Sequence, residues 1–216
     1  GLKTPGAEDV TARHRTGPRL VHFDGGVFVR PTIVRCDSFA HPLANKEFLF
    51  PYAHTVEEIK ERLDATGLKI VLHNLPAGDW DAGERGIACH PNRVSEFRMG
   101  VDQAIDYAST LGVKQLNCLI GKLPTNASSL QIDQTVIENL RFAATALHKH
   151  GMDLLIEPIN TFDIPGFYLS HTQQALELIE KVGADNLFVQ YDIYHMQRME
   201  GEIAATLNKQ LSRIRH

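Results

Sequence analysis

From residue 55 onward, the hydrophobic and polar positions of the chain change their period in a regular order. Thr55 begins a predicted helix, because Glu58 stands at the capping-box position and apolar residues recur on one stripe up to Gly67. That glycine suits a left-handed helix cap, and the apolar run over residues 68–75 then predicts a buried strand. A helix and the strand that follows it therefore form one unit.

The same unit recurs three more times along the chain. Each copy has an amphipathic helical stripe, a glycine and a short apolar run, with the glycines at Gly112, Gly151 and Gly183. Strands that alternate with helices at this spacing are typical of a parallel sheet with crossover helices. We expect parallel strands in sequence order, with the helices outside, near residues 48–52, 69–74, 116–120, 153–157 and 188–192.

Residues 1–46 follow a different pattern. They hold nine of the 26 glycine and proline residues, show no helical period and contain only short apolar runs at 20–23 and 27–29. Their seven Lys and Arg against four Asp and Glu give a charge of +3, which leaves −7 for the rest. An Arg-rich targeting leader should be poor in acidic residues. We therefore predict a loosely ordered or non-native segment over 1–46 and a folded domain over 47–216.

The composition is that of an ordinary globular protein with one substantial core. Of 216 residues, 43% are hydrophobic and 22% are charged, and the formal net charge is −4. This balance excludes a globally basic nucleic-acid binder and predicts no attraction to an anionic membrane, and no apolar run is long enough to cross a bilayer. Three scattered cysteines without a C-x-x-C pair argue against a structural zinc site and favour reduced thiols in a cytoplasmic protein.

Two parallel architectures fit this alternation, an open doubly wound sheet and a closed (β/α)8 TIM barrel. A dinucleotide-binding open sheet should carry G-x-G-x-x-G after its first strand, and a phosphate loop should carry G-x-x-x-x-G-K-[ST]. Neither motif occurs, so we expect no nucleotide cofactor. The predicted strands instead carry polar residues at their C-terminal ends, which is the catalytic end of a barrel. The pattern therefore favours an α/β fold of the barrel type.

Three polar residues at these strand ends could hold a metal ion. Glu157 closes the apolar run 154–156, where a carboxylate must be protonated, bound to a metal or paired with a neighbouring Arg or Lys. Asp192 ends the next strand, and His195 follows three residues later. Two carboxylates and an imidazole on one rim suit a divalent cation that polarises a carbonyl group.

Three further residues are candidates for substrate binding, each with a structural alternative. His73, at the end of the strand 69–74, binds substrate or is a hydrogen-bonded core histidine. Arg85 lies in a glycine-rich loop, where its guanidinium fork could clamp a carboxylate or simply be solvated. Lys122, directly after Gly121, has the same two interpretations.

Seven runs of residues at and between these candidates form a specific pattern. They are Phe48–Tyr52, Leu72–Trp80, Gly83–Cys89, Asn117–Lys122, Leu155–Asn160, Asp163–Phe167 and Gln190–Gly201. Together the runs extend almost continuously over residues 47–216 and resemble the hydroxypyruvate isomerase family, which belongs to the xylose-isomerase-like TIM barrels.

The resemblance implies an isomerase that interconverts hydroxypyruvate and 2-hydroxy-3-oxopropanoate (tartronate semialdehyde) by enediolate proton transfer. It implies that Glu157 is one of two catalytic glutamates and that Glu157 and Asp192 bind a divalent metal ion, Mg or Mn. His195 matches a site position of the wider superfamily, and we expect it to bind the substrate or to orient the metal ion. The resemblance also implies a cytoplasmic enzyme of glyoxylate and carbohydrate metabolism that acts on a small hydroxy or keto acid, and it leaves a homo-oligomer open.

The resemblance fails at both ends of the chain. Residues 1–46 lack the family's first strand and helix, and His216 falls within what resembles the start of the seventh strand, before the second catalytic glutamate. We therefore expect an incomplete barrel, with the first strand replaced and the last strands missing, that has little or no isomerase activity by itself. Two alternatives stay open, an isomerase or epimerase of a related sugar acid on the same barrel and a non-catalytic truncated product.

Overall fold

The computed structural model divides the chain into two compact units, Gly1–Phe48 and Leu49–His216. The residues that the structure describes are 7–9, 20–23, 26–29, 34–36 and 51–216.

Two antiparallel strand pairs form the described part of the first unit. Strand β1 (Ala7–Asp9) pairs with β4 (Val34–Cys36), and β2 (Leu20–Phe23) pairs with β3 (Gly26–Val29) in a hairpin. The two short apolar runs noted in the sequence therefore pair with each other. The remainder of residues 1–46 lies outside the described residues, so the expected loose order stays a prediction.

A parallel sheet is the centre of the second unit. Its strands are β5 (His73–Asn74), β6 (Gln115–Cys118), β7 (Asp153–Ile156) and β8 (Leu187–Val189), paired in that order. Ile214 forms a further parallel bridge with Val189, so the sheet continues beyond β8. The predicted parallel arrangement in sequence order is confirmed for these strands.

The prediction of a strand at residues 48–52 is wrong for the residues that can be compared. Pro51–Ala53 forms a short 3-10 helix, η1, and residues 48–50 lie outside the described part of the chain. Pro51 has no backbone N–H and cannot donate a ladder hydrogen bond, which disfavours a strand through this position. The strand predicted at 69–74 is also shorter than expected, because only its last 2 residues pair with β6.

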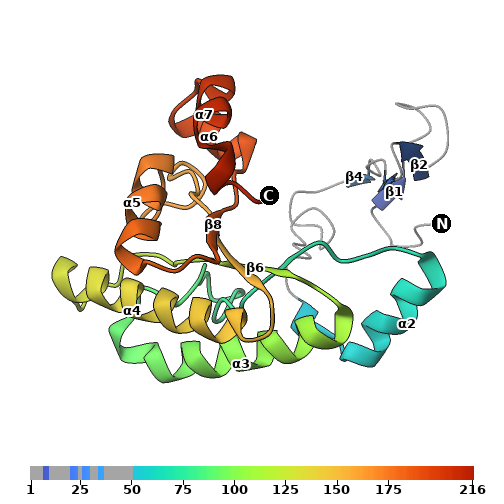
Figure 1. Cartoon of the computed structure of the whole chain (residues 1–216), viewed down its shortest axis with the longest axis horizontal. Helices are drawn as coiled ribbons and strands as arrows, with labels where there is room; N and C mark the ends of the chain where they lie inside the picture. The colour runs from blue at the N-terminus through green and yellow to red at the C-terminus, as the bar shows by residue number, and fades with distance from the viewer. Residues whose placement is uncertain (1–6, 10–19, 24–25, 30–33, 37–50) are drawn as a thin grey trace. The chain divides into compact units, whose positions relative to one another are not determined.

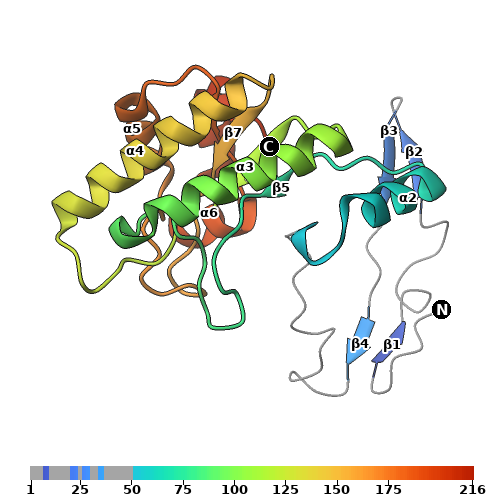
Figure 2. The same cartoon turned by 90° about the horizontal axis from the view of Figure 1, so that it is seen from below.

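Helices alternate with the strands of the sheet. They are α2 (Val56–Thr66), α3 (Val94–Leu111), α4 (Ser129–His148), α5 (Thr172–Val182), α6 (Ile193–Met199) and α7 (Ile203–Gln210), with 3-10 turns η2 (Pro91–Arg93) and η3 (Leu211–Arg213). The predicted capping box of Thr55 and Glu58 is confirmed at the start of α2. Helices α3 and α4 lie side by side in both views of the fold (Figure 1, Figure 2). Within the described part of the chain, every helix is too short or too polar to span a bilayer.

Alternate residues of the strands lie on opposite faces of the sheet. One row faces the helices and consists of His73, Leu116, Leu154 and Leu187, of which the three leucines belong to the core. The next row, one residue further along each strand, lies on the other face and consists of Asn74, Asn117, Leu155 and Phe188. Glu157 and Gln190 follow two residues after Leu155 and Phe188, so this second face leads to the candidate site.

Candidate active site

Three side chains converge at the C-terminal ends of β7 and β8. Glu157 directly follows β7, Asp192 is the N-cap of α6, and His195 lies in the first turn of that helix. One potential ligand atom of each residue lies within 4.8 Å of those of the other two. The structure thus brings together the three residues that the sequence analysis singled out for a metal ion.

The local sequence explains how His195 reaches the two carboxylates. Asp192 Oδ1 accepts hydrogen bonds from the backbone N–H groups of Tyr194 at 2.7 Å and of His195 at 3.3 Å, so it caps α6. The other carboxylate oxygen, Oδ2, lies 3.9 Å from Nε2 of His195. An aspartate followed by a histidine three residues later therefore places both groups at the start of one helix.

The carboxyl group of Glu157 is buried, with 7% of the residue exposed. Burial raises the pKa of Glu157 to about 7, and the nearby negative charge of Asp192 acts in the same direction. Side-chain hydrogen bonds from Gln190 and Asn117 oppose this rise, because they stabilise the ionised form. Glu157 can therefore take up or release a proton near neutral pH.

An asparagine on the neighbouring strand holds the Glu157 carboxylate in place. The Nδ2 group of Asn117 donates to Oε2 of Glu157 at 3.0 Å and to Oδ1 of Asn74 at 2.8 Å. Asn117 is completely buried, and its register beside Asn74 on β5 follows from the pairing of β5 with β6. Sequence reasoning missed this role, although the polar ends of the strands were visible as a signal.

His73 is a neutral, buried histidine at the end of β5. Its Nδ1 lies 3.0 Å from the backbone oxygen of Asn74 and 3.3 Å from the hydroxyl of Tyr52. Because a carbonyl oxygen only accepts, Nδ1 carries the proton and Nε2 is an acceptor. Nε2 is buried and has no hydrogen-bond partner among the described residues, and burial lowers the pKa of His73. Because His73 pairs with Leu116, it lies on the helix-facing side of the sheet, opposite to the row of Asn74 and Asn117.

Arg85 and Lys122 are tied to the loop 78–86. The Nη1 group of Arg85 donates to the backbone oxygens of Trp80 at 3.1 Å and Glu84 at 2.7 Å, and its guanidinium group lies 3.9 Å from the centroid of the Trp80 ring. Lys122 Nζ donates to the backbone oxygen of Gly83 at 2.9 Å. Both cations thus stabilise this loop, and their contact with substrate stays a prediction.

A second polar cluster, which sequence reasoning missed, borders the site. Asp163 accepts hydrogen bonds from Tyr194 Oη at 2.6 Å and from Arg198 Nη1 at 2.7 Å. The Nδ2 group of Asn160 lies 2.9 Å from Asp163 Oδ2 and 2.7 Å from Nδ1 of His195. These contacts join the segment after β7 to α6 over separations of 31 to 35 residues, so no local sequence pattern could reveal them.

The donor set suits a hard divalent cation. Glu157 and Asp192 both offer carboxylate oxygens, which such cations prefer as ligands. The mutual repulsion of these two groups contributes to the raised pKa of Glu157, and a bound cation would relieve it. Gln190 adds a buried Oε1 that has no hydrogen-bond partner among the described residues. The observed residues therefore fit part of a metal-ligand shell.

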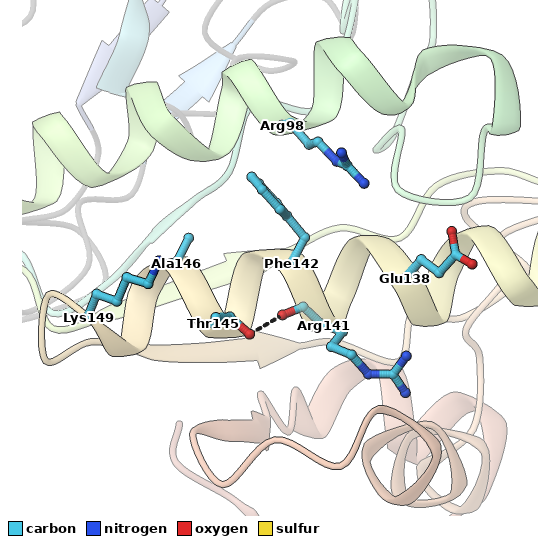
Figure 3. Close-up of a pocket in the computed structure, with 7 residues that line it drawn as sticks. All are labelled: Arg98, Glu138, Arg141, Phe142, Thr145, Ala146 and Lys149. Carbon is cyan, nitrogen blue, oxygen red and sulfur yellow. Dashed lines mark hydrogen bonds between the residues drawn. The ribbon is translucent and has the colours of Figure 1, made fainter.

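Two cavities elsewhere on the second unit are not lined by converging carboxylates. One, of about 440 Å³, lies along α3 and α4, where Arg98 and Phe142 are drawn in Figure 3. The guanidinium group of Arg98 lies 4.9 Å from the Phe142 ring centroid, and Arg141 donates to the backbone oxygen of Val182 at 3.1 Å. We interpret this cavity as a packing groove between helices. The other cavity, of about 550 Å³, lies beside Leu68, at the N-terminal edge of the sheet and so away from the catalytic end of a barrel.

The fold and the polar rim place this chain in a known class of proteins. The chain belongs to the xylose isomerase-like TIM barrel family, whose sequence pattern matches residues 36–216. The parallel sheet, its crossover helices and the carboxylates at the C-terminal strand ends are features of such a barrel. The fold class and the family predicted from the sequence are confirmed.

Two isomerases and one solved structure are similar to this chain. The chain is 59% identical over 170 residues to hydroxypyruvate isomerase of Escherichia coli (strain K12) and 43% identical over 170 residues to 2-oxo-tetronate isomerase of Cupriavidus necator. These matches cover 79% of this chain but 66% and 65% of the relatives, so the chain spans about two thirds of their length. The crystal structure of AP endonuclease, family 2, from Brucella melitensis matches with a TM-score of 0.73 at 38% identity, over 76% of this chain and 64% of that one.

Proposed function

We propose that this protein is an isomerase that interconverts hydroxypyruvate and 2-hydroxy-3-oxopropanoate. The observation that carries the proposal is the buried Glu157, with a pKa of about 7, at the strand ends of a chain that is 59% identical to the E. coli hydroxypyruvate isomerase. A carboxylate base of this kind is what proton transfer next to a carbonyl group requires.

The reaction moves a carbonyl group by one carbon. Glu157 removes a proton from the hydroxyl-bearing carbon, and the electron pair of that bond forms the carbon–carbon double bond of an enediolate while the carbonyl oxygen becomes an oxyanion. The proton then returns to the neighbouring carbon, and the remaining hydroxyl proton passes to the oxyanion. The product is an aldehyde with the same atoms as the substrate. A base with a pKa of about 7 suits both the uptake and the return of the proton.

The other candidate residues position the substrate around Glu157. His195 lies beside the carboxylates and can donate a hydrogen bond to the developing oxyanion. Arg85 and Lys122, on and beside the loop 78–86, supply positive charge for the substrate carboxylate.

Glu157 and Asp192 would hold a divalent cation, Mg²⁺ or Mn²⁺. When bound, such a cation supplies electrostatic stabilisation for the oxygen on which negative charge develops. Asp192 suits this role because its Oδ1 caps α6 and thereby fixes the carboxylate. Titration of the protein with Mn²⁺ checks the assignment, since Asp192→Asn should weaken the affinity and an unchanged affinity would contradict it.

A related sugar acid is the second candidate substrate. The 43% identity to 2-oxo-tetronate isomerase of Cupriavidus necator supports this alternative. The same base and the same rim would serve either acid, because the two reactions differ in the substrate that the loops must accommodate. Substrate choice therefore rests on the loops after the strands rather than on Glu157.

Solvent exchange tests the proposed reaction. In D₂O, an enediolate mechanism replaces the carbon-bound proton of hydroxypyruvate with deuterium while the aldehyde product appears, and both changes are followed by proton NMR. In a chimera that continues from His216 into the E. coli sequence, Glu157→Gln should slow exchange by about 10²–10⁴-fold, because it removes the base. Glu138→Gln is the matched control, since Glu138 is exposed on α4 and should leave the rate unchanged.

Two outcomes of this assay would contradict the proposed base or the proposed substrate. Exchange that persists at the full rate in Glu157→Gln would contradict the role of this residue as base. Exchange with 2-oxo-tetronate but not with hydroxypyruvate would favour the second candidate. The expectation of little or no isomerase activity in the 216 residues by themselves stays a prediction, measured against the same chimera.

A further inference from the structure

We propose that Asn160 is a positioning residue that holds His195 in the tautomer with the proton on Nε2. The inference rests on the proposed function and deepens it, because it makes His195 a hydrogen-bond donor toward the substrate instead of a third metal ligand. The distances alone would admit His195 to the metal-binding group. The hydrogen bonds around its ring favour a donor to the substrate instead.

Asp163 fixes the orientation of the Asn160 side-chain amide. The backbone N–H of Asp163 donates to Oδ1 of Asn160 at 2.9 Å, and an N–H group can only donate, so the accepting atom must be the oxygen. The other amide atom lies 2.9 Å from Asp163 Oδ2, and a carboxylate oxygen only accepts, so that atom must be the nitrogen. Asn160 is completely buried, and both contacts require the same orientation.

The amide nitrogen of Asn160 then determines the state of the histidine ring. It has two N–H groups, of which one reaches Asp163 and the other reaches Nδ1 of His195 at 2.7 Å. A ring nitrogen that accepts a hydrogen bond carries no proton. The neutral ring of His195 therefore carries its proton on Nε2.

Hydrogen bonds from Tyr194 and Arg198 keep Asp163 an acceptor and so prevent the Asn160 amide group from flipping. Tyr194 Oη donates to Asp163 Oδ2 at 2.6 Å, and Arg198 Nη1 donates to Oδ1 at 2.7 Å. With both oxygens accepting hydrogen bonds, a reversed Asn160 amide would place an oxygen against a carboxylate and an N–H against the Asp163 N–H. The observed orientation is therefore the one that the cluster supports.

This tautomer changes what His195 can do at the site. Nε2 is on the side of the converged carboxylates, 3.9 Å from Asp192 Oδ2. A protonated ring nitrogen has no lone pair for a cation, so the carboxylates are left to bind the metal ion. The N–H group instead provides a fixed donor, which is what a developing oxyanion requires.

Nitrogen NMR of the intact chain determines the tautomer of His195 directly. Long-range ¹H–¹⁵N correlation spectra distinguish protonated from unprotonated ring nitrogens when they are recorded well above the ordinary histidine pKa of about 6.5. His195→Gln identifies the relevant signals among those of the 11 histidines. We expect an unprotonated Nδ1 and a protonated Nε2 in the parent protein. A protonated Nδ1 would overturn the proposal, whichever substrate the protein uses.

A variant tests the role of Asn160 in setting this state. In Asn160→Asp, the new carboxylate cannot donate to Nδ1, so we expect that nitrogen to become protonated. In the chimera that continues from His216 into the E. coli sequence, we expect the same variant to lower the isomerase kcat by about 10²–10³-fold, with a smaller change in KM. Asn208→Asp adds the same charge at an exposed position on α7 and should change neither. An unchanged tautomer in a folded Asn160→Asp protein, or a reversed tautomer with undiminished kcat, would refute the positioning role. If the variant does not fold, the spectrum of the parent protein alone decides the tautomer.

Discussion

The ionisation of Glu157 connects the chemistry of the site with the stability of the fold. Burial raises the pKa of this residue to about 7, whereas a glutamate in an unfolded chain has a pKa of about 4.3. An acid whose pKa is higher in the folded state binds its proton more tightly there. Its contribution to stability is therefore complete below about pH 4 and is lost as the pH rises toward 7.

Glu157→Gln should remove this pH dependence, because glutamine cannot ionise. Near pH 4 we expect the variant and the parent protein to have similar free energies of unfolding, and at about pH 8 we expect the variant to be more stable by on the order of 3 kcal/mol. Urea denaturation in the presence of a chelator, at a series of pH values, measures the difference. A difference that does not change with pH would show that Glu157 ionises equally readily in the folded and unfolded states.

His73 and His195 use the same ring nitrogen, Nδ1, for their protein contacts, but in opposite roles. In His73, Nδ1 donates to a backbone carbonyl and Nε2 is left as a buried acceptor. In His195, Nδ1 accepts from Asn160, so Nε2 is left as a donor. The hydrogen-bond partner of Nδ1 therefore decides which tautomer each histidine adopts.

At the scale of elements, two glycines dock the loop 78–86 against the end of β6. A Cβ atom at Gly86 would lie 2.1 Å from the backbone oxygen of Leu119, and one at Gly121 would lie 2.5 Å from the backbone oxygen of Gly86. Backbone atoms cannot move aside as a flexible side chain can. The loop that carries Arg85 is therefore positioned by direct contact between two backbones.

Gly86→Ala should destabilise the protein more than Gly83→Ala in the same loop. Both glycines have positive φ angles, 114° and 89°, but a Cβ at Gly83 meets nothing within 4 Å. We expect a loss of about 1–2 kcal/mol for Gly83→Ala from the backbone conformation alone, and about 1–3 kcal/mol more for Gly86→Ala from the clash. Urea denaturation compares the two, and equal losses would show that the loop can move away from β6.

At the scale of the whole second unit, its last residues support the strand end that carries Asp192. The backbone N–H of Tyr191 donates to the oxygen of His216 at 2.8 Å, and that of Arg215 donates to Val189 at 3.1 Å. The Arg215 guanidinium group also lies 4.1 Å from the centroid of the Phe188 ring. Residues far along the sequence therefore hold the backbone directly before the candidate metal ligand.

Deletion of Ile214–His216 should destabilise the second unit and weaken Mn²⁺ binding. The deletion removes three backbone hydrogen bonds, two of them to the β8 end and one from Ile214 to Leu211, together with the packing of Ile214. These losses predict a fall of about 2–3 kcal/mol in the free energy of unfolding. Leu211→Ala is the control, because Leu211 is 67% exposed and its loss should change stability by less than about 0.5 kcal/mol. Equal stabilities of the deletion variant and the parent protein would contradict this support.

Much of the fold is determined by the sequence by itself, because its signals are local. Helix caps such as the one at Thr55 depend on residues within one turn, and apolar periodicity distinguishes helices from buried strands. In a parallel sheet the C-terminal ends of all strands meet at one edge, so the convergence of Glu157, Asp192 and His195 follows from topology. The resemblance of the motif runs to the hydroxypyruvate isomerase family adds the class of reaction, and the family match supports it.

Only the tertiary structure decided how those residues are set for chemistry. The hydrogen bond from Asn117 to Glu157 spans 40 residues, and the contact of Asn160 with His195 spans 35. Such pairs depend on strand register and on side-chain conformation, which no periodicity encodes. The pKa of Glu157 likewise depends on the burial that packing creates around it. Sequence therefore determined which groups reach the rim, and tertiary structure decided their protonation and orientation, because desolvation and hydrogen bonding act between neighbours in space.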